Sequence, residues 1–121
     1  MALSASLPSL RIQSQMVKQT TATATPDNDV TGGSTTLYML DINNGAGQKN
    51  FIRVWNAGTP VSGTTVPDII IPVAAGQRQI VAILEGLALG TAFSWCATQS
   101  AGTVGAVNPS GGNIAIISLT K

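Results

Sequence analysis

The stretch that decides the fold covers residues 63–85 and reads GTTVPDIIIPVAAGQRQIVAILE. It contains two runs rich in Ile and Val, separated by the short segment 74–77. Runs of this length and composition are typical of strands rather than helices. We expect the two runs to pair as a central antiparallel hairpin. Pro67 and Pro72 lack an amide donor, which places the first of these strands at the margin of a sheet.

Alternating apolar and polar residues continue on both sides of this hairpin. The pattern predicts further strands at residues 35–43, 50–56, 91–98 and 113–120. Asn and Gly between the first two of these strands favour a turn, so we expect a second hairpin there. Residues 99–112 read as a loop. Residues 20–34 have little to bury and predict a long loop, or an arm lying on another subunit.

Seven or eight short strands without a helical pattern indicate an all-β protein. We expect a single antiparallel β-sandwich of jelly-roll or immunoglobulin-like type, with an extended N-terminal arm or loop. Residues 1–34 would form this arm, or a first strand, with the Thr-rich loop, and residues 35–121 the sandwich domain. Several strands are apolar on both sides although a sandwich buries one, so we expect the second apolar face to meet another subunit.

The composition restricts the kind of partner. Charged residues make up 9% of the 121-residue chain and the net charge is +1, against about 25% charged residues in an average soluble domain. No basic patch is present to neutralise a phosphate backbone, so we expect no nucleic-acid partner. Such a surface gives little colloidal repulsion. Either neighbouring subunits cover it, or the protein is a small neutral monomer.

The sequence gives no sign of export or membrane insertion. Its first residues lack the basic and apolar regions of a secretory signal, and no run reaches the roughly 20 apolar residues that span a bilayer. We expect no membrane partner and a protein made in a cytoplasm. Cys96 is the single cysteine, so the chain can form no disulfide within itself.

The residues argue against an enzyme. The chain has no histidine, which removes Ser-His-Asp and Cys-His nucleophiles and the commonest zinc sites. Cys96 has no basic neighbour in sequence and is interpreted as a packed thiol. Asp41, Asp68 and Glu85 lie near strand ends, where carboxylates cap turn amides or stay solvated. We expect no catalytic residue, no metal and no cofactor.

An acidic cluster at Asp27, Asn28 and Asp29 resembles a calcium loop weakly, because it lacks the bidentate Glu and the full ligand spacing. A turn in which the side chains cap their own backbone explains the cluster more simply.

Two groups of residues are candidates for a subunit interface. In the strand at 50–56, Ile52 and Val54 face away from Phe51, Arg53 and Trp55. If the core takes the Ile–Val side, the other three are exposed candidate interface residues, with Arg53 and Trp55 as anchors. The alternative is that Phe51 and Trp55 belong to the core and Ile52 and Val54 face out. The second group is the apolar side of the N-terminal segment: Leu3, Leu7, Leu10, Ile12 and Met16. This segment could add a strand to a neighbour's sheet edge, or form the first strand of the protein's own sheet.

From residue 37 onward, the order of motifs resembles small β-sandwich virion proteins of tailed bacteriophages. The similar pieces are LYMLDINN (37–44), FIRVWN (51–56), GTTVPDIIIPV (63–73) and GTAFSWCAT (90–98). The resemblance implies a structural component of a phage particle without catalysis. It does not cover residues 1–34, so an attachment role for the arm is inferred from the residues alone.

On this basis we expect a capsid decoration or cement protein. It would bind the major capsid protein on the outside of the assembled shell, as a homotrimer on local symmetry axes. One alternative is a tail or tail-fibre component that presents the loops 20–34 and 99–112 to the host. A second is a carbohydrate-binding module in which Trp55, Trp95 and Tyr38 stack on sugar rings.

Overall fold

Strands alone form the regular structure of residues 15–100 and 106–121, the part of the chain that the computed structural model describes. In chain order they are β1 (Gln15–Gln19), β2 (Thr35–Asn44), β3 (Asn50–Trp55), β4 (Ile69–Val73), β5 (Arg78–Leu89), β6 (Ser94–Thr98) and β7 (Ile114–Thr120). Seven strands without a helix in these residues confirm the predicted all-β class.

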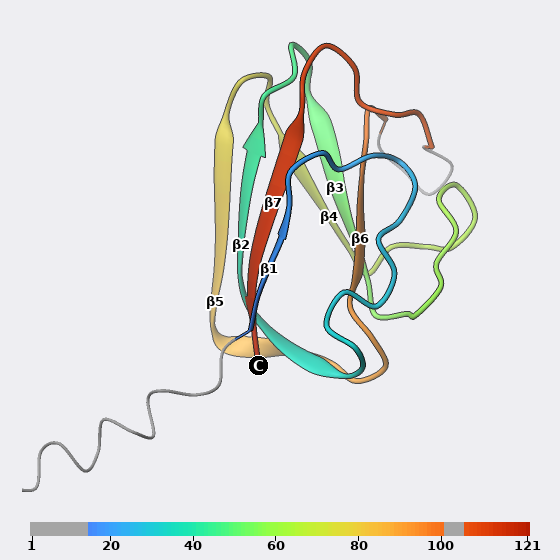
Figure 1. The fold of residues 1–121 in the computed structure, drawn as a ribbon, viewed down its shortest axis with the longest axis vertical. Coiled ribbons are helices and arrows are strands. Elements are labelled where there is room, and N and C mark those ends of the chain that lie inside the picture. The colour runs from blue at the N-terminus through green and yellow to red at the C-terminus, as the bar shows by residue number, and fades with distance from the viewer. Residues whose placement is uncertain (1–14, 101–105) are drawn as a thin grey trace, which may run out of the picture.

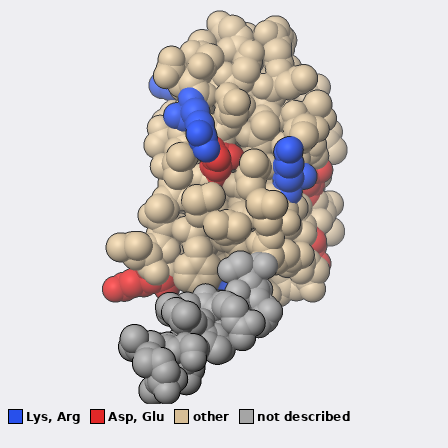
Figure 2. Space-filling view, turned by 60° about the vertical axis from the view of Figure 1, so that its left-hand side comes forward, with Lys and Arg blue, Asp and Glu red and all other residues tan. Residues whose placement is uncertain are grey.

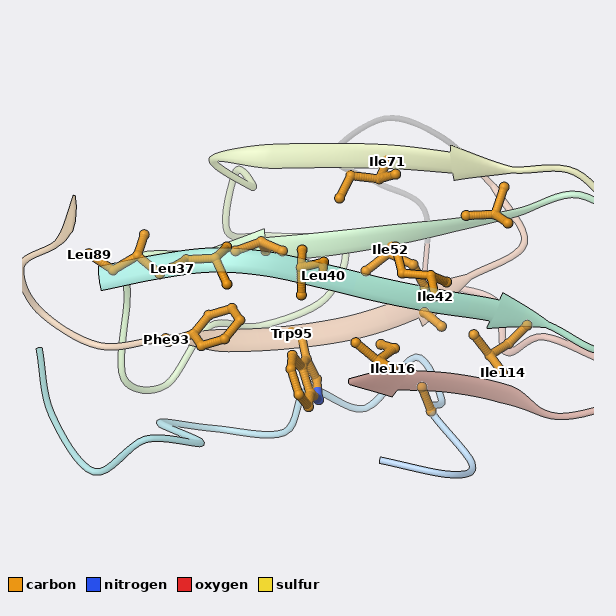
Figure 3. Packing of buried hydrophobic residues seen from close by; sticks show 14 of the residues in the cluster. Leu37, Leu40, Ile42, Ile52, Ile71, Leu89, Phe93, Trp95, Ile114 and Ile116 are labelled. Carbon is orange, nitrogen blue, oxygen red and sulfur yellow. The ribbon is translucent and has the colours of Figure 1, made fainter. Parts of the chain in front are cut away.

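The strands form two antiparallel sheets that pack face to face as a sandwich (Figure 1). The larger sheet has the order β1-β7-β2-β5 and the smaller one β4-β3-β6. Alternate residues of β7, such as Ile114 and Ile116, point inward and are fully buried. They meet Ile52 and Trp95 of the smaller sheet in one apolar core (Figure 3). The predicted β-sandwich is therefore present.

Both predicted hairpins are wrong. β2 lies in the larger sheet and β3 in the smaller one, and the same holds for β5 and β4. The chain therefore crosses from one sheet to the other at each of these turns. β4 pairs with β3 and lies at an edge, as Pro72 predicts.

Asn44, the last residue of β2, holds these two crossings together. Its side chain is fully buried. Five groups from the two crossings lie within hydrogen-bond distance of its amide: Nδ2 donates to the carbonyl oxygens of Gln48 (2.9 Å), Val73 (3.0 Å) and Ala74 (3.1 Å), and Oδ1 accepts from Ala46 N–H (3.0 Å) and Asn50 Nδ2 (3.1 Å). At these crossings the backbone groups no longer pair with a neighbouring strand. Without Asn44 they would be buried without hydrogen-bond partners, which lowers the stability of the fold.

The N-terminal segment, where it is described, belongs to the sandwich. β1 pairs with β7 of the same chain, so residues 15–19 form a strand of the protein's own sheet. Residues 20–34 run along the open edge of β6, with backbone hydrogen bonds from Ala97 N–H to Thr23 O (2.9 Å) and from Val30 N–H to Phe93 O (2.8 Å). Residues 20–34 therefore form a long loop, as one of the two predicted alternatives had it, and this loop packs on the protein's own β6 rather than on another subunit.

β5 is the longest strand, and it bends where its pairing with β2 is interrupted. Met39 pairs with Ala82 and Leu37 with Leu87, so four residues of β5 stand opposite one residue of β2. Gly86 lies in this bulge with φ +78°. A Cβ atom at Gly86 would collide with the methyl group of Thr36 and lie 2.9 Å from the ring of Tyr38.

We predict that Asn44→Ala lowers the free energy of unfolding by on the order of 3 kcal/mol, because it leaves several buried backbone groups without partners. Asn43→Ala is the control, since Asn43 is the exposed neighbouring residue; it should change the value by less than about 0.5 kcal/mol. Urea unfolding of the two variants measures both changes. Equal values for the two would contradict the role assigned to Asn44.

Gly86→Ala should destabilise the protein by about 1–3 kcal/mol, because the new methyl group meets both strain at positive φ and a steric collision. Gly90→Ala serves as the control, since nothing lies within 4 Å of a Cβ there. Thermal unfolding followed by circular dichroism compares them. An unchanged midpoint for Gly86→Ala would show that the bulge adjusts freely.

Candidate interaction surface

The outer face of the larger sheet carries a continuous row of apolar side chains. In the strand register, Met16 pairs with Leu119, Leu119 with Met39, and Met39 with Ala82, so the row crosses all four strands. Met16 is 67% exposed. Figure 2, turned so that the β5 side comes forward, shows that few charged side chains interrupt the uncharged surface. No described segment of the chain therefore covers this face.

A second row on the same face combines apolar residues with one ion pair. Here Lys18 pairs with Ile117, Ile117 with Asp41, and Asp41 with Ile80. Asp41 accepts two hydrogen bonds from Arg78, from Nε to Oδ1 (2.8 Å) and from Nη2 to Oδ2 (2.6 Å). The hydrogen bond from Arg78 holds the pKa of Asp41 below its usual value. At neutral pH the pair therefore adds two opposite charges and no net charge to the face.

The sequence predicted an apolar second face but not its position. Met16 lies on this face, exposed as expected of a candidate interface residue. The other candidates of the N-terminal segment, Leu3, Leu7, Leu10 and Ile12, lie outside the described residues. Ile80 and Leu84 of β5, which are 49% and 97% exposed, were not among the residues predicted to form an interface. The sequence feature that could have identified these two residues is that β5 carries apolar residues on both of its faces.

The expectation that Arg53 and Trp55 are exposed anchors is wrong, because both are buried. Loops cover the outer face of the smaller sheet: Trp55 Nε1 donates to Thr65 O (3.1 Å), and Arg53 Nη2 donates to Ser100 O (2.7 Å). Phe51 is half-buried. The alternative, in which Ile52 and Val54 face out, is wrong as well, because both are fully buried.

Stacking on sugar rings is not supported by the positions of the aromatic residues. Trp95 is fully buried, packs edge to face against Phe93 with ring centroids 5.2 Å apart, and donates through Nε1 to Asp27 Oδ2 (2.9 Å). With Trp55 also buried, only Tyr38 of the three proposed rings is partly exposed. The two tryptophans therefore offer no open ring face to a glycan.

The carboxylates mostly serve local structure. Asp68 Oδ2 accepts from Asn56 N–H (2.6 Å), and Asp29 Oδ1 accepts from Gly33 N–H (2.7 Å). The second contact caps a turn, as the interpretation of the acidic cluster as a capped turn predicts. Glu85 lies exposed in the β5 bulge and Asp41 is paired with Arg78. No two of these carboxylates are brought together by a described contact.

Cys96 is buried in β6, and this burial raises the pKa of its thiol. The nearest polar partner is Ser62 Oγ, 3.4 Å from Sγ. A thiol held protonated and out of contact with water is a poor nucleophile.

We predict that Cys96 reacts with a thiol reagent in the folded protein on the order of 100-fold more slowly than after unfolding, because the reaction requires opening of the core. The rate at neutral pH with and without guanidinium measures this. Thr64→Cys is the control, because position 64 is exposed. The thiol introduced there should react at once, while Cys96 of the same protein stays slow. Prompt labelling of Cys96 itself would show that β6 is accessible.

Other site types find no support in the described residues. No group of three or more His, Cys, Asp or Glu side chains could hold a metal ion in residues 15–100 and 106–121. The same residues include no helix that is long and apolar enough to cross a membrane. Comparisons of the chain with protein-family models, curated proteins and solved structures found no match.

Proposed function

We propose that this protein is a virion structural protein that decorates the outside of an assembled bacteriophage capsid and stabilises it without catalysis. The observation that supports this most is the bare outer face of the larger sheet, with its row Met16, Leu119, Met39 and Ala82. An apolar face with so few charges is typical of a surface that binds another protein. The resemblance of the strand motifs to phage virion proteins gives the class of partner, a major capsid protein.

The stabilising mechanism follows from binding linkage. A protein that binds the assembled shell but not its separated subunits adds its binding free energy to the shell, about 2.7 kcal/mol per site when its free concentration is 100 times Kd. The sandwich suits this role because its core is continuous and its smaller sheet is already covered by the protein's own loops. The outer face of the larger sheet is then the side that meets the shell.

We expect Met16→Glu to abolish binding to shells from which the protein has been removed, because it places a charge in the apolar row. Met16 is mostly exposed, so the substitution should leave the fold intact. Val61→Glu is the matched control, since Val61 is 56% exposed in the loop between β3 and β4. Co-sedimentation with shells measures binding, and equal binding of both variants would contradict the assigned face.

The stabilising role is tested separately. Shells that carry the protein should rupture at a higher temperature than shells without it, and electron microscopy of labelled virions should place it on the capsid. An unchanged rupture temperature would count against stabilisation. Labelling of the tail instead would assign the protein to a tail or fibre.

A further inference from the structure

The sandwich has four sheet edges, and three of them are protected. β4 carries Pro72 in a strand of five residues, and β6 is covered by residues 20–34. β1 is also five residues long and contains Lys18. Short strands, proline, lysine and covering segments are the usual means by which proteins prevent edge-to-edge association. The fourth edge, β5, has twelve residues, no proline and no lysine. A bulge also protects an edge, but that of β5 is confined to residues 83–86 and leaves residues 78–82 as a regular open edge.

The open side of β5 presents main-chain groups to solvent. Asn44 N–H donates to Gln77 O (2.8 Å), which fixes the hydrogen-bonding phase of the β2–β5 ladder. In an antiparallel ladder, alternate residues point their N–H and C=O groups toward and away from the neighbouring strand. With the observed register, Arg78, Ile80 and Ala82 point theirs away from β2. Among the described residues, no main-chain hydrogen bond reaches this side.

The side chains of this edge are also suited to pairing. Ala82 ends the apolar row of the outer face, and Ile80 lies beside it, so an added strand would continue that row. Leu84 is almost fully exposed within the bulge. Six consecutive uncharged residues, 79–84, lie between Arg78 and Glu85. A basic residue therefore begins the strand, where Arg78 is paired with Asp41 but stays largely exposed, an acidic residue, Glu85, lies in the bulge, and the residues between them are uncharged.

This charge order decides the occupant. A copy of β5 laid antiparallel brings the Arg78 end of one strand toward the Glu85 end of the other, whereas a parallel copy would align like charges. We propose that β5 pairs antiparallel with β5 of a second copy of this chain about a two-fold axis. The pairing joins two four-stranded sheets into one continuous sheet. The inference depends on the edge alone and not on the proposed function.

The mass of the full chain in solution tests this pairing. Light scattering after gel filtration should give a concentration-dependent species of twice the 12.3 kDa chain mass. Hydrogen exchange should show protected amides at Arg78, Ile80 and Ala82, which point away from the protein's own sheet. A monomer at all concentrations, the trimer expected from the sequence, or a dimer with freely exchanging amides at these three positions would each overturn the pairing.

Two variants locate the interface. Ala82→Pro removes an outward N–H without removing a hydrogen bond to β2, and Leu84→Lys brings a positive charge toward the partner's Arg78. Each should raise the dimer dissociation constant by about tenfold or more, which corresponds to about 1.4 kcal/mol. Val66→Lys, at a 69% exposed loop residue, should leave the constant unchanged.

Leu84→Lys keeps the test valid if Ala82→Pro fails to fold, because the Leu84 side chain has almost no contacts to lose. Dimers of unchanged affinity in a folded Leu84→Lys protein would overturn the pairing.

Discussion

The buried amide of Asn44 is the contact on which the arrangement of the two sheets depends. At this end of the sandwich the chain crosses between sheets from β2 to β3 and from β4 to β5, and the connection from β6 to β7 begins and ends here as well. Each crossing takes backbone groups out of a ladder and into the interior. A single side chain with both a donor and an acceptor satisfies groups from both crossings, and the hydrogen bond from Gly76 N–H to Ala46 O (3.1 Å) joins the turns directly.

The positions of the strands could be predicted from the sequence, but their pairing could not. Alternation of apolar residues is a local property, and it located β2, β3, β6 and β7 to within a few residues. Partner choice depends on distant contacts. Ile71 and Val73 on β4, and Val81 and Ile83 on β5, pack toward the same core from opposite layers. The alternation is the same whether two such strands pair or face each other across a core, so the hairpin and the crossing could not be distinguished.

Arg53 shows why the side of β3 that meets solvent could not be predicted. A fully buried arginine is rare, and charge alone places it outside. Here neutral acceptors replace part of the lost hydration: Nε donates to Thr98 Oγ1 (2.9 Å) and Nη2 to Ser100 O, while Nη1 is buried without a partner among the described residues. These partners are 45 and 47 residues away in the chain. No local pattern reveals that loops will cover this face of the smaller sheet.

The two layers of the sandwich therefore differ in how they use a sequence with few charges. The smaller sheet is closed on its outer side by the protein's own loops, and its edges are protected by Pro72 and by residues 20–34. Met16, Ile80 and Leu84 give the larger sheet an uncovered apolar area on its outer face and β5 edge, while Val61, Val66, Ile70 and Val107 are exposed elsewhere on the described residues. With a net charge of +1, long-range repulsion does little to keep other molecules away from that area. The hydrophobic effect is not directional, so the apolar row by itself does not fix how a bound molecule is oriented. The few charged groups beside the row, Lys18 and the Asp41–Arg78 pair, are what can fix that orientation.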